Sequence, residues 1–192
     1  MPNNIAKNTG KEKIVYQGRI IEVVEQRVTI GDKEKTFEFA RRSPGVRLII
    51  VTSENKILLT KEYRKEIDGY DFRLPGGKVF DELSEYNNFL SSDKNIIEQA
   101  EIAAKKEALE EVGIVVDNIT YFYTSKAGAT VVWDLFYFVV SKYSHADNGQ
   151  SLEHGEDIEI VEADLEEAKQ ICLDGRMSED RSAAVLMRFL TK

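Results

Sequence analysis

The chain has little of several residue types on which common kinds of site depend. Its 192 residues include one cysteine, Cys172, and two histidines, His145 and His154. A single cysteine excludes an intrachain disulfide and a cysteine-based zinc site, and two histidines exclude a histidine-rich metal site. Any metal would therefore be held by oxygen ligands, which magnesium, manganese and calcium prefer.

Long apolar runs are missing as well. No run approaches the roughly 20 residues that a membrane helix needs. The polar start of the chain, Met1–Lys13, lacks the apolar core of a signal peptide. We therefore expect a cytoplasmic protein that has no membrane partner.

Basic charge is in deficit. Lysine and arginine number 26 against 34 for aspartate and glutamate, which gives a formal net charge of −8. This deficit argues against binding of nucleic acid by phosphate neutralisation, so no nucleic-acid partner is expected. An anionic substrate is still allowed, because a bound divalent cation reverses the local field.

The length suits one ordinary domain with a small appendage, and the patterning divides it. Residues 1–12 are interpreted as a flexible tail. Residues 13–45 form a β-rich N-terminal extension that ends where Ser43-Pro44-Gly45 breaks the alternation. Residues 46–192 then form the main domain, starting with a hairpin across Ser53–Asn55. Within it we expect a loop over 80–93, a helix over 95–112 capped by Ser92 or Asp93 and ended by Gly113, strands at 119–124, 131–140 and 158–162, and helices at 164–173 and 178–190.

The helix over 95–112 carries an unusual cluster of carboxylates. Glu107, Glu110 and Glu111 are spaced so that they share one side of the helix, about a turn apart. Like charges so close cost helix stability, and the macrodipole disfavours negative charge at this C-terminal end. A solvated acidic face is one interpretation. A divalent cation, approached also by backbone carbonyls of the Pro75-Gly76-Gly77 turn, is the other, since it would relieve both penalties.

These residues resemble the Nudix box, G-x5-E-x7-R-E-U-x-E-E-x-G-U. Gly77 supplies its leading glycine, and the chain matches it from Glu98 to Ile114 with one departure, Lys106 in place of arginine. The resemblance implies that Glu107 and Glu111 bind Mg²⁺, or Mn²⁺ in its place, with Glu110 assisting and the backbone carbonyl of Gly76 as a further ligand. Glu98 and Lys106 would orient these ligands. Lys106 keeps the charge of arginine and lacks its planar fork.

Further landmarks resemble the ADP-ribose and nucleoside-diphosphate-sugar pyrophosphatase branch of the Nudix hydrolase superfamily. They are the opening segment 12–20, Arg42-Ser43-Pro44-Gly45-Val46, the strand 58–64 that ends in Tyr63-Arg64, and the acidic loop and strand 155–161. The resemblance implies an α/β/α sandwich and pairing as a homodimer through the N-terminal β segment. It also implies a glutamate base before the late strand, for which Glu156 matches best and Glu153, His154 and Asp157 are alternatives. Arg42 and Arg64 would lie near the diphosphate, and Tyr63, Tyr70 or Phe72 could stack on a base.

Three features depart from the branch. Between Gly77 and Glu98 lie 20 residues where the pattern has five, and this insert is either a surface loop or a lid over the substrate. The region 124–130 lacks the proline that ADP-ribose enzymes usually carry. Arg73 stands where the branch often has glutamate. The specificity could therefore favour another nucleotide sugar.

The sequence thus predicts a magnesium-dependent pyrophosphatase that splits a nucleoside diphosphate sugar into a nucleoside monophosphate and a sugar phosphate. One alternative is a hydrolase of another nucleoside diphosphate derivative, such as a dinucleotide, or of a nucleoside triphosphate. The other is a Nudix-fold sensor that binds a nucleotide without cleaving it. The complete set Glu107, Glu110 and Glu111 favours an enzyme.

Overall fold

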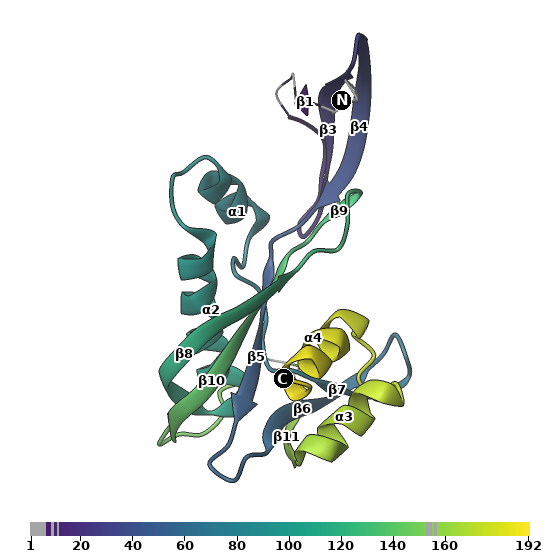
Figure 1. Cartoon of the computed structure of the whole chain (residues 1–192). Helices are drawn as coiled ribbons and strands as arrows, with labels where there is room; N and C mark the ends of the chain where they lie inside the picture. The colour runs from purple at the N-terminus through teal and green to yellow at the C-terminus, as the bar shows by residue number, and fades with distance from the viewer. Residues whose placement is uncertain (1–6, 9, 11, 153–154, 156) are drawn as a thin grey trace. The chain divides into compact units, whose positions relative to one another are not determined.

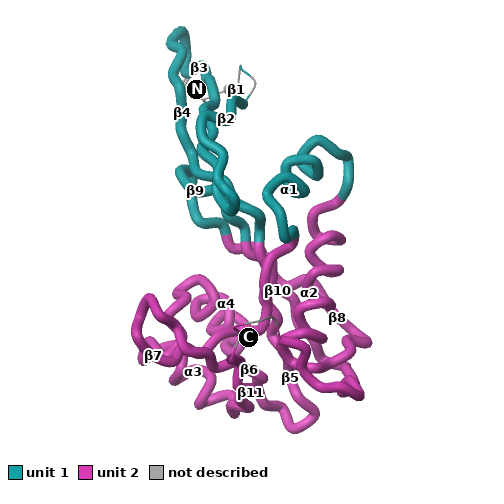
Figure 2. Tube along the Cα trace, turned by 180° about the vertical axis from the view of Figure 1, so that it is seen from behind, with its two compact units in different colours: residues 1–44, 80–94, 126–134 teal, residues 45–79, 95–125, 135–192 magenta. Residues whose placement is uncertain are grey.

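The computed structural model describes residues 7–8, 10, 12–152, 155 and 157–192. By compactness the chain divides into two units (Figure 2). Unit 1 comprises residues 1–44, 80–94 and 126–134, and unit 2 comprises residues 45–79, 95–125 and 135–192. Unit 1 therefore gathers three segments that are far apart in the sequence, one of which is the insert after Gly77.

Unit 1 is built on an antiparallel sheet with one parallel edge. The sheet has the order β1-β3-β4-β9, and β2 also pairs with β3. Strands β3 and β4 run antiparallel around a turn at Gly31, whose φ of 61° suits glycine. The bounds are β1 Lys7–Asn8, β2 Lys13–Gln17, β3 Glu22–Ile30, β4 Lys33–Arg41 and β9 Val131–Val132.

The insert forms a helix, α1 (Leu83–Leu90), which belongs to unit 1. Its side chain Asn87 donates to the fully buried Glu22 of β3 over 2.9 Å, and Arg41 of β4 donates to the other oxygen of Glu22 over 2.6 Å. Phe80, just before the helix, stacks on Tyr86. The hydrogen bond of Asn87 with Glu22 thus joins the insert to the N-terminal sheet, and the aromatic contact packs the insert on itself.

Unit 2 is built on a mixed sheet of order β11-β6-β5-β10-β8, with β7 paired to β6 (Figure 1). Strands β5 and β10 are parallel at its centre, and the other pairs are antiparallel. Strand β5 and the first half of β10, residues 135–140, are almost continuously buried, as expected for strands covered on both faces. The bounds are β5 Gly45–Val51, β6 Ile57–Arg64, β7 Gly69–Arg73, β8 Ile114–Ser125, β10 Leu135–His145 and β11 Ile158–Ala163.

Helices cover both faces of this sheet. On one face α2 (Ile96–Val112) packs on β8, β5 and β10 through a row of alanines, and on the other lie α3 (Leu165–Leu173) and α4 (Asp180–Leu190) (Figure 1). Tyr137 of β10 faces α4, where its hydroxyl lies 3.2 Å from that of Ser182. None of the described helices has the length and apolar character needed to cross a membrane. The buried residues of α2 are Ala100, Ala103, Ala104, Ala108 and Val112.

Most predicted elements are present, and three details were wrong. The segment 80–93, predicted to be a loop, contains α1. Only Leu83 and Tyr86 of this helix are buried, so its many polar residues hid the helical pattern in the sequence. The cap of α2 is Asn95, whose side chain accepts from the amide of Ile97, instead of Ser92 or Asp93. The strand predicted over 131–140 is two strands, β9 and β10, which belong to different units.

Candidate active site

The loop Leu74–Gly77 lies against strand β5 through backbone contacts. Val46 donates its amide to the carbonyl of Gly77 over 3.0 Å, and Leu48 donates to Pro75 over 2.8 Å. Gly76 has a φ of +146°, and a Cβ atom at this position would lie 2.2 Å from the carbonyl oxygen of Val46. Only glycine fits here, so the loop backbone approaches the strand as closely as a backbone can.

Two of the predicted ligands of α2 meet this loop. The carboxylate of Glu111 accepts the amide of Gly76 over 2.7 Å. A Cβ atom on Gly77 would lie 2.1 Å from Oε1 of Glu107, so that carboxylate occupies the space left by the missing side chain. The structure therefore brings Gly76, Glu107 and Glu111 together, although Gly76 and Glu111 are 35 positions apart.

The remaining residues of the predicted motif also lie on α2. Glu110 forms an i,i+4 ion pair with Lys106, with 3.6 Å between Oε2 and Nζ. Glu98 is in the first turn, where its carboxylate accepts from the side chain of Asn95 over 3.3 Å. A carboxylate in the first turn is favoured by the helix macrodipole. Glu98 is nine positions before Glu107, and its hydrogen bond with Asn95 joins it to the helix cap.

The donors at this loop suit a hard divalent cation. Glu107 and Glu111 supply carboxylate oxygens, and their contacts with Gly77 and Gly76 place them beside the backbone of this loop. Among the residues that the structure describes, no three aspartate, glutamate, histidine or cysteine side chains converge closely enough to hold a metal by themselves. A backbone carbonyl such as that of Gly76 would therefore complete the donor set with the two carboxylates.

The C-terminal end of α2 is held by a loop that the sequence did not indicate. Gln150 donates its side-chain amide to the carbonyl of Glu111 over 2.6 Å and to that of Ile158 over 3.2 Å. Ser151 donates its backbone amide to Glu110 over 2.9 Å. These donors satisfy helix-end carbonyls that have no partner within the helix. No spacing pattern links Gln150 to Glu111, so only the fold reveals the contact.

The predicted general base falls mostly outside the described residues. Glu156 and the alternatives Glu153 and His154 are not among them. Asp157 is described, and it is exposed directly before β11. Because Gln150 joins Ile158 to Glu111, the start of β11 is anchored to the end of the helix that carries the carboxylates.

The predicted substrate-binding residues lie in both units. Arg64 ends β6, where Nη2 pairs with Glu62 over 2.7 Å and the buried Nε has no hydrogen-bond partner among the described residues. Tyr63 is half exposed, bonds to Asp68 and lies edge-on to Tyr70 at 5.9 Å. Arg42 belongs to unit 1, where its guanidinium lies 4.2 Å from the centre of the Trp133 ring.

The NUDIX domain family matches residues 41–185, which is most of the chain. The chain belongs to the NUDIX family. This match confirms the predicted family, and the glutamates of α2 lie within it. A solved structure titled "Crystal structure of ADP compounds hydrolase" superimposes with a TM-score of 0.67 at 18% identity, covering 94% of this chain and 89% of that one. The predicted α/β fold is thereby confirmed.

Two curated relatives cover nearly the whole chain. The ADP-ribose pyrophosphatase of Bacillus subtilis (strain 168) is 26% identical over 188 residues, which are 96% of this chain and 91% of the relative. The methanol dehydrogenase activator of Bacillus methanolicus is 22% identical over 178 residues, or 92% and 88% of the two chains. With the family match, the first relative confirms the predicted enzyme class, a Nudix pyrophosphatase.

Proposed function

We propose that this NUDIX protein hydrolyses the pyrophosphate bond of ADP-ribose or another nucleoside diphosphate sugar. The products would be a nucleoside monophosphate and a sugar phosphate. The observation that carries this proposal is the meeting of Glu107 and Glu111 at the glycine loop 76–77. The relative named as an ADP-ribose pyrophosphatase supports the choice of substrate class.

The reaction needs a divalent cation, and we propose Mg²⁺, with Mn²⁺ as a substitute. Glu107, Glu111 and the carbonyl of Gly76 would hold it, and Glu110 would assist. When bound, such an ion neutralises diphosphate oxygens and lowers the pKa of a water molecule. Lys106 would keep Glu110 oriented through their ion pair. Glu98 is assigned to orientation as well, through the cap of α2.

The remaining steps use side chains of this chain. Arg64, Arg42 and Tyr63 would bind the diphosphate and the nucleoside. Glu156 would accept a proton from the attacking water, with Glu110 as a second carboxylate, while a P–O bond forms from that water. The bridging P–O bond breaks, and the departing phosphate keeps the bridging oxygen, with its electron pair.

The first test is turnover of a substrate panel. Purified protein with Mg²⁺ should convert ADP-ribose or other nucleotide sugars to products from which a phosphatase releases inorganic phosphate. Glu111→Gln should reduce kcat more than about 100-fold, because it removes a charge that holds the cation at the transferring phosphoryl group. Glu101→Gln is the matched control, since Glu101 lies on the same helix and pairs with Lys105 away from the loop.

The panel also separates the alternatives. Turnover of dinucleotides or nucleoside triphosphates alone would replace the proposed substrate class. Tight binding of a nucleotide sugar, with no turnover at any Mg²⁺ or Mn²⁺ concentration, would instead favour a sensor. Equal activity of Glu111→Gln and the unmodified protein would contradict the assigned ligand set.

A further inference from the structure

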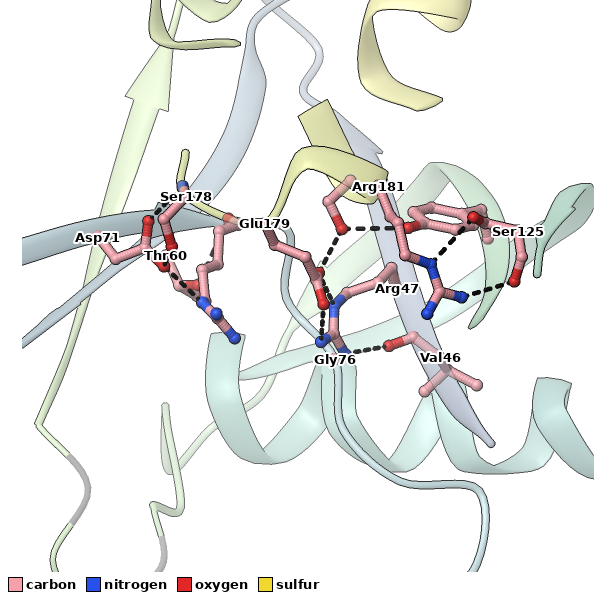
Figure 3. A network of polar contacts seen from close by, with 12 residues as sticks. Val46, Arg47, Thr60, Asp71, Gly76, Ser125, Ser178, Glu179 and Arg181 are labelled. Carbon is pink, nitrogen blue, oxygen red and sulfur yellow. Dashed lines mark hydrogen bonds and ion pairs between the residues drawn. The ribbon is translucent and has the colours of Figure 1, made fainter. Parts of the chain in front are cut away.

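A buried ion pair lies behind the glycine loop, on the face of the sheet that α4 covers (Figure 3). Arg47 of β5 donates Nε and Nη2 to the two carboxylate oxygens of Glu179 over 2.9 and 3.2 Å. The side chains are only 9% and 12% exposed. Glu179 directly precedes α4, so this bidentate pair joins two elements separated by 132 positions.

The pair reaches the loop through one backbone atom. Arg47 donates its Nη1 to the carbonyl oxygen of Val46 over 2.8 Å. A Cβ atom on Gly76 would collide with this same carbonyl oxygen. The amide of Val46 donates to the carbonyl of Gly77. The position of the Val46 peptide therefore sets where the backbone of residues 76–77 can lie.

The start of the loop is attached to the segment Ser178–Glu179, which directly precedes α4. Arg73, the residue before Leu74, donates its Nε to Asp71 over 2.7 Å. Asp71 is fully buried and accepts both the backbone amide and the hydroxyl of Ser178, over 2.7 and 2.9 Å (Figure 3). Ser178 and Glu179 are neighbours in the sequence. The segment before α4 therefore contacts both β7, through Asp71, and β5, through Arg47.

Arg47 pairs with Glu179 and Arg73 pairs with Asp71, so the charges of these four side chains balance. Burial raises the pKa of Glu179, but the charge and hydrogen bonds of Arg47 outweigh it, so the pKa lies below its ordinary value and the carboxylate stays ionised. An apolar pair of the same volume would cost no more in stability. It would, however, leave the Val46 carbonyl without its Arg47 donor. The distinctive effect of the ion pair is therefore on backbone position.

We propose that Arg47 and Glu179 are positioning residues, which hold the Gly76–Gly77 backbone where Glu107 and Glu111 meet it. The inference rests on the proposed function, because it assigns the loop to the cation site. It also accounts for Arg73 at the position where the sequence suggested a change of specificity: this arginine neutralises Asp71 and is part of the support of the loop.

The test uses Glu179→Gln and Arg47→Lys in the full chain. Glu179→Gln removes the charge and keeps the shape, whereas Arg47→Lys keeps the charge and loses the fork, which protects the fold. In both variants the Mg²⁺ concentration for half-maximal activity should rise about 10-fold, the usual effect of losing a residue that supports a metal ligand. The KM for the nucleotide sugar at saturating Mg²⁺ should stay unchanged.

A second readout does not depend on activity. Hydrogen exchange of the backbone amides of Leu74, Gly76 and Gly77 should be faster in both variants, and Mn²⁺ binding followed by calorimetry should weaken. The control is Glu167→Gln, because Glu167 forms an exposed pair with Arg176 and should change neither measurement.

The outcomes separate the two proposals. If the unmodified protein hydrolyses no nucleotide sugar, the proposed function fails, while exchange and Mn²⁺ binding still test the positioning role. If the variants match the unmodified protein in both of those measurements, the positioning role is overturned. It is overturned equally if activity only falls in proportion to the folded fraction, with an unchanged Mg²⁺ dependence.

Discussion

At the scale of single residues, the site depends on the absence of side chains as much as on their presence. Gly77 leaves the space that the Glu107 carboxylate fills, and Gly76 lies against the carbonyl of Val46. Neither glycine supplies a functional group beyond its backbone. Both allow a backbone and a charged side chain to come within contact distance, which is the usual requirement for glycine at a ligand-binding loop.

The substitution Gly77→Ala tests this requirement. The added methyl group would lie 2.1 Å from Oε1 of Glu107, so that carboxylate must move away from the loop. We expect kcat to fall by about 10- to 100-fold, comparable with loss of a residue that orients a metal ligand. Steady-state kinetics at several Mg²⁺ concentrations measure the effect.

Gly69→Ala is the matched control for that variant. A Cβ at Gly69 would have only the carbonyl of Ile67 nearby, at 3.7 Å, which is an ordinary contact. Its activity should equal that of the unmodified protein. Full activity of Gly77→Ala would show that the position of Glu107 against the loop is irrelevant to the reaction.

The residues that touch the loop were predictable in part. Gly76, Glu107 and Glu111 follow a motif with fixed spacing, and the structure brings them together. Arg47 and Glu179 were not predictable, because a pairing across 132 positions leaves no local pattern. The roles of Glu156, Arg42 and Arg64 stay predictions.

At the scale of elements, a helix was predictable from the sequence where its apolar residues recur at helical spacing. Helix α2 repeats buried alanines at helical spacing and ends at Gly113, whose φ of 67° suits the left-handed cap. Helix α1 was missed because only Leu83 and Tyr86 are buried among polar neighbours. Its stability comes from contacts with β3 and the nearby aromatic rings, which a reading of local sequence cannot supply.

The connection between α2 and β11 gives the prediction at this scale. Gln150→Glu keeps the size of the side chain and removes the amide that donates to the carbonyls of Glu111 and Ile158. The new carboxylate would face two acceptors, so the free energy of unfolding should fall by about 1–3 kcal/mol. Urea unfolding measures this change.

An equivalent exchange on the surface serves as its control. Asn118 is exposed on β8 with Lys142 as its cross-strand partner, and Asn118→Asp should not lower the unfolding midpoint. A Gln150→Glu protein as stable as the control would mean that the bridge contributes nothing to the junction of helix and strand.

At the scale of the whole molecule, the homodimer stays a prediction, and exposed apolar side chains of unit 1 are where we expect it to form. Several lie on or beside the first strands of unit 1: Ile14 is 42% exposed, Tyr16 57%, Ile20 58% and Phe37 49%. Apolar surface of this kind is typical of protein interfaces. Association through a shared patch would generate the two-fold pairing commonest among oligomers.

The homodimer prediction is tested by mass in solution. Light scattering after size-exclusion chromatography should give twice the chain mass for the unmodified protein, and the mass of one chain for the double variant Tyr16→Ser with Ile20→Ser. Ile102→Ser is the control, because Ile102 is 64% exposed on α2 in the other unit. A dimer that survives the double substitution would place the interface elsewhere.

The alanine row of α2 restricts which substitutions this protein can tolerate. Ala100, Ala104 and Ala108 are fully buried where the helix meets the sheet, and larger side chains there would overpack the interface and push the helix outward. Because the same helix carries Glu107 and Glu111, such a shift would also move the carboxylates away from the glycine loop. Glu107 and Glu111 follow Ala100 and Ala104 by seven positions, about two helical turns, so they lie on the same side of α2. That side is constrained by volume along its length and by charge near its end, so few substitutions there would leave both the packing and the site intact.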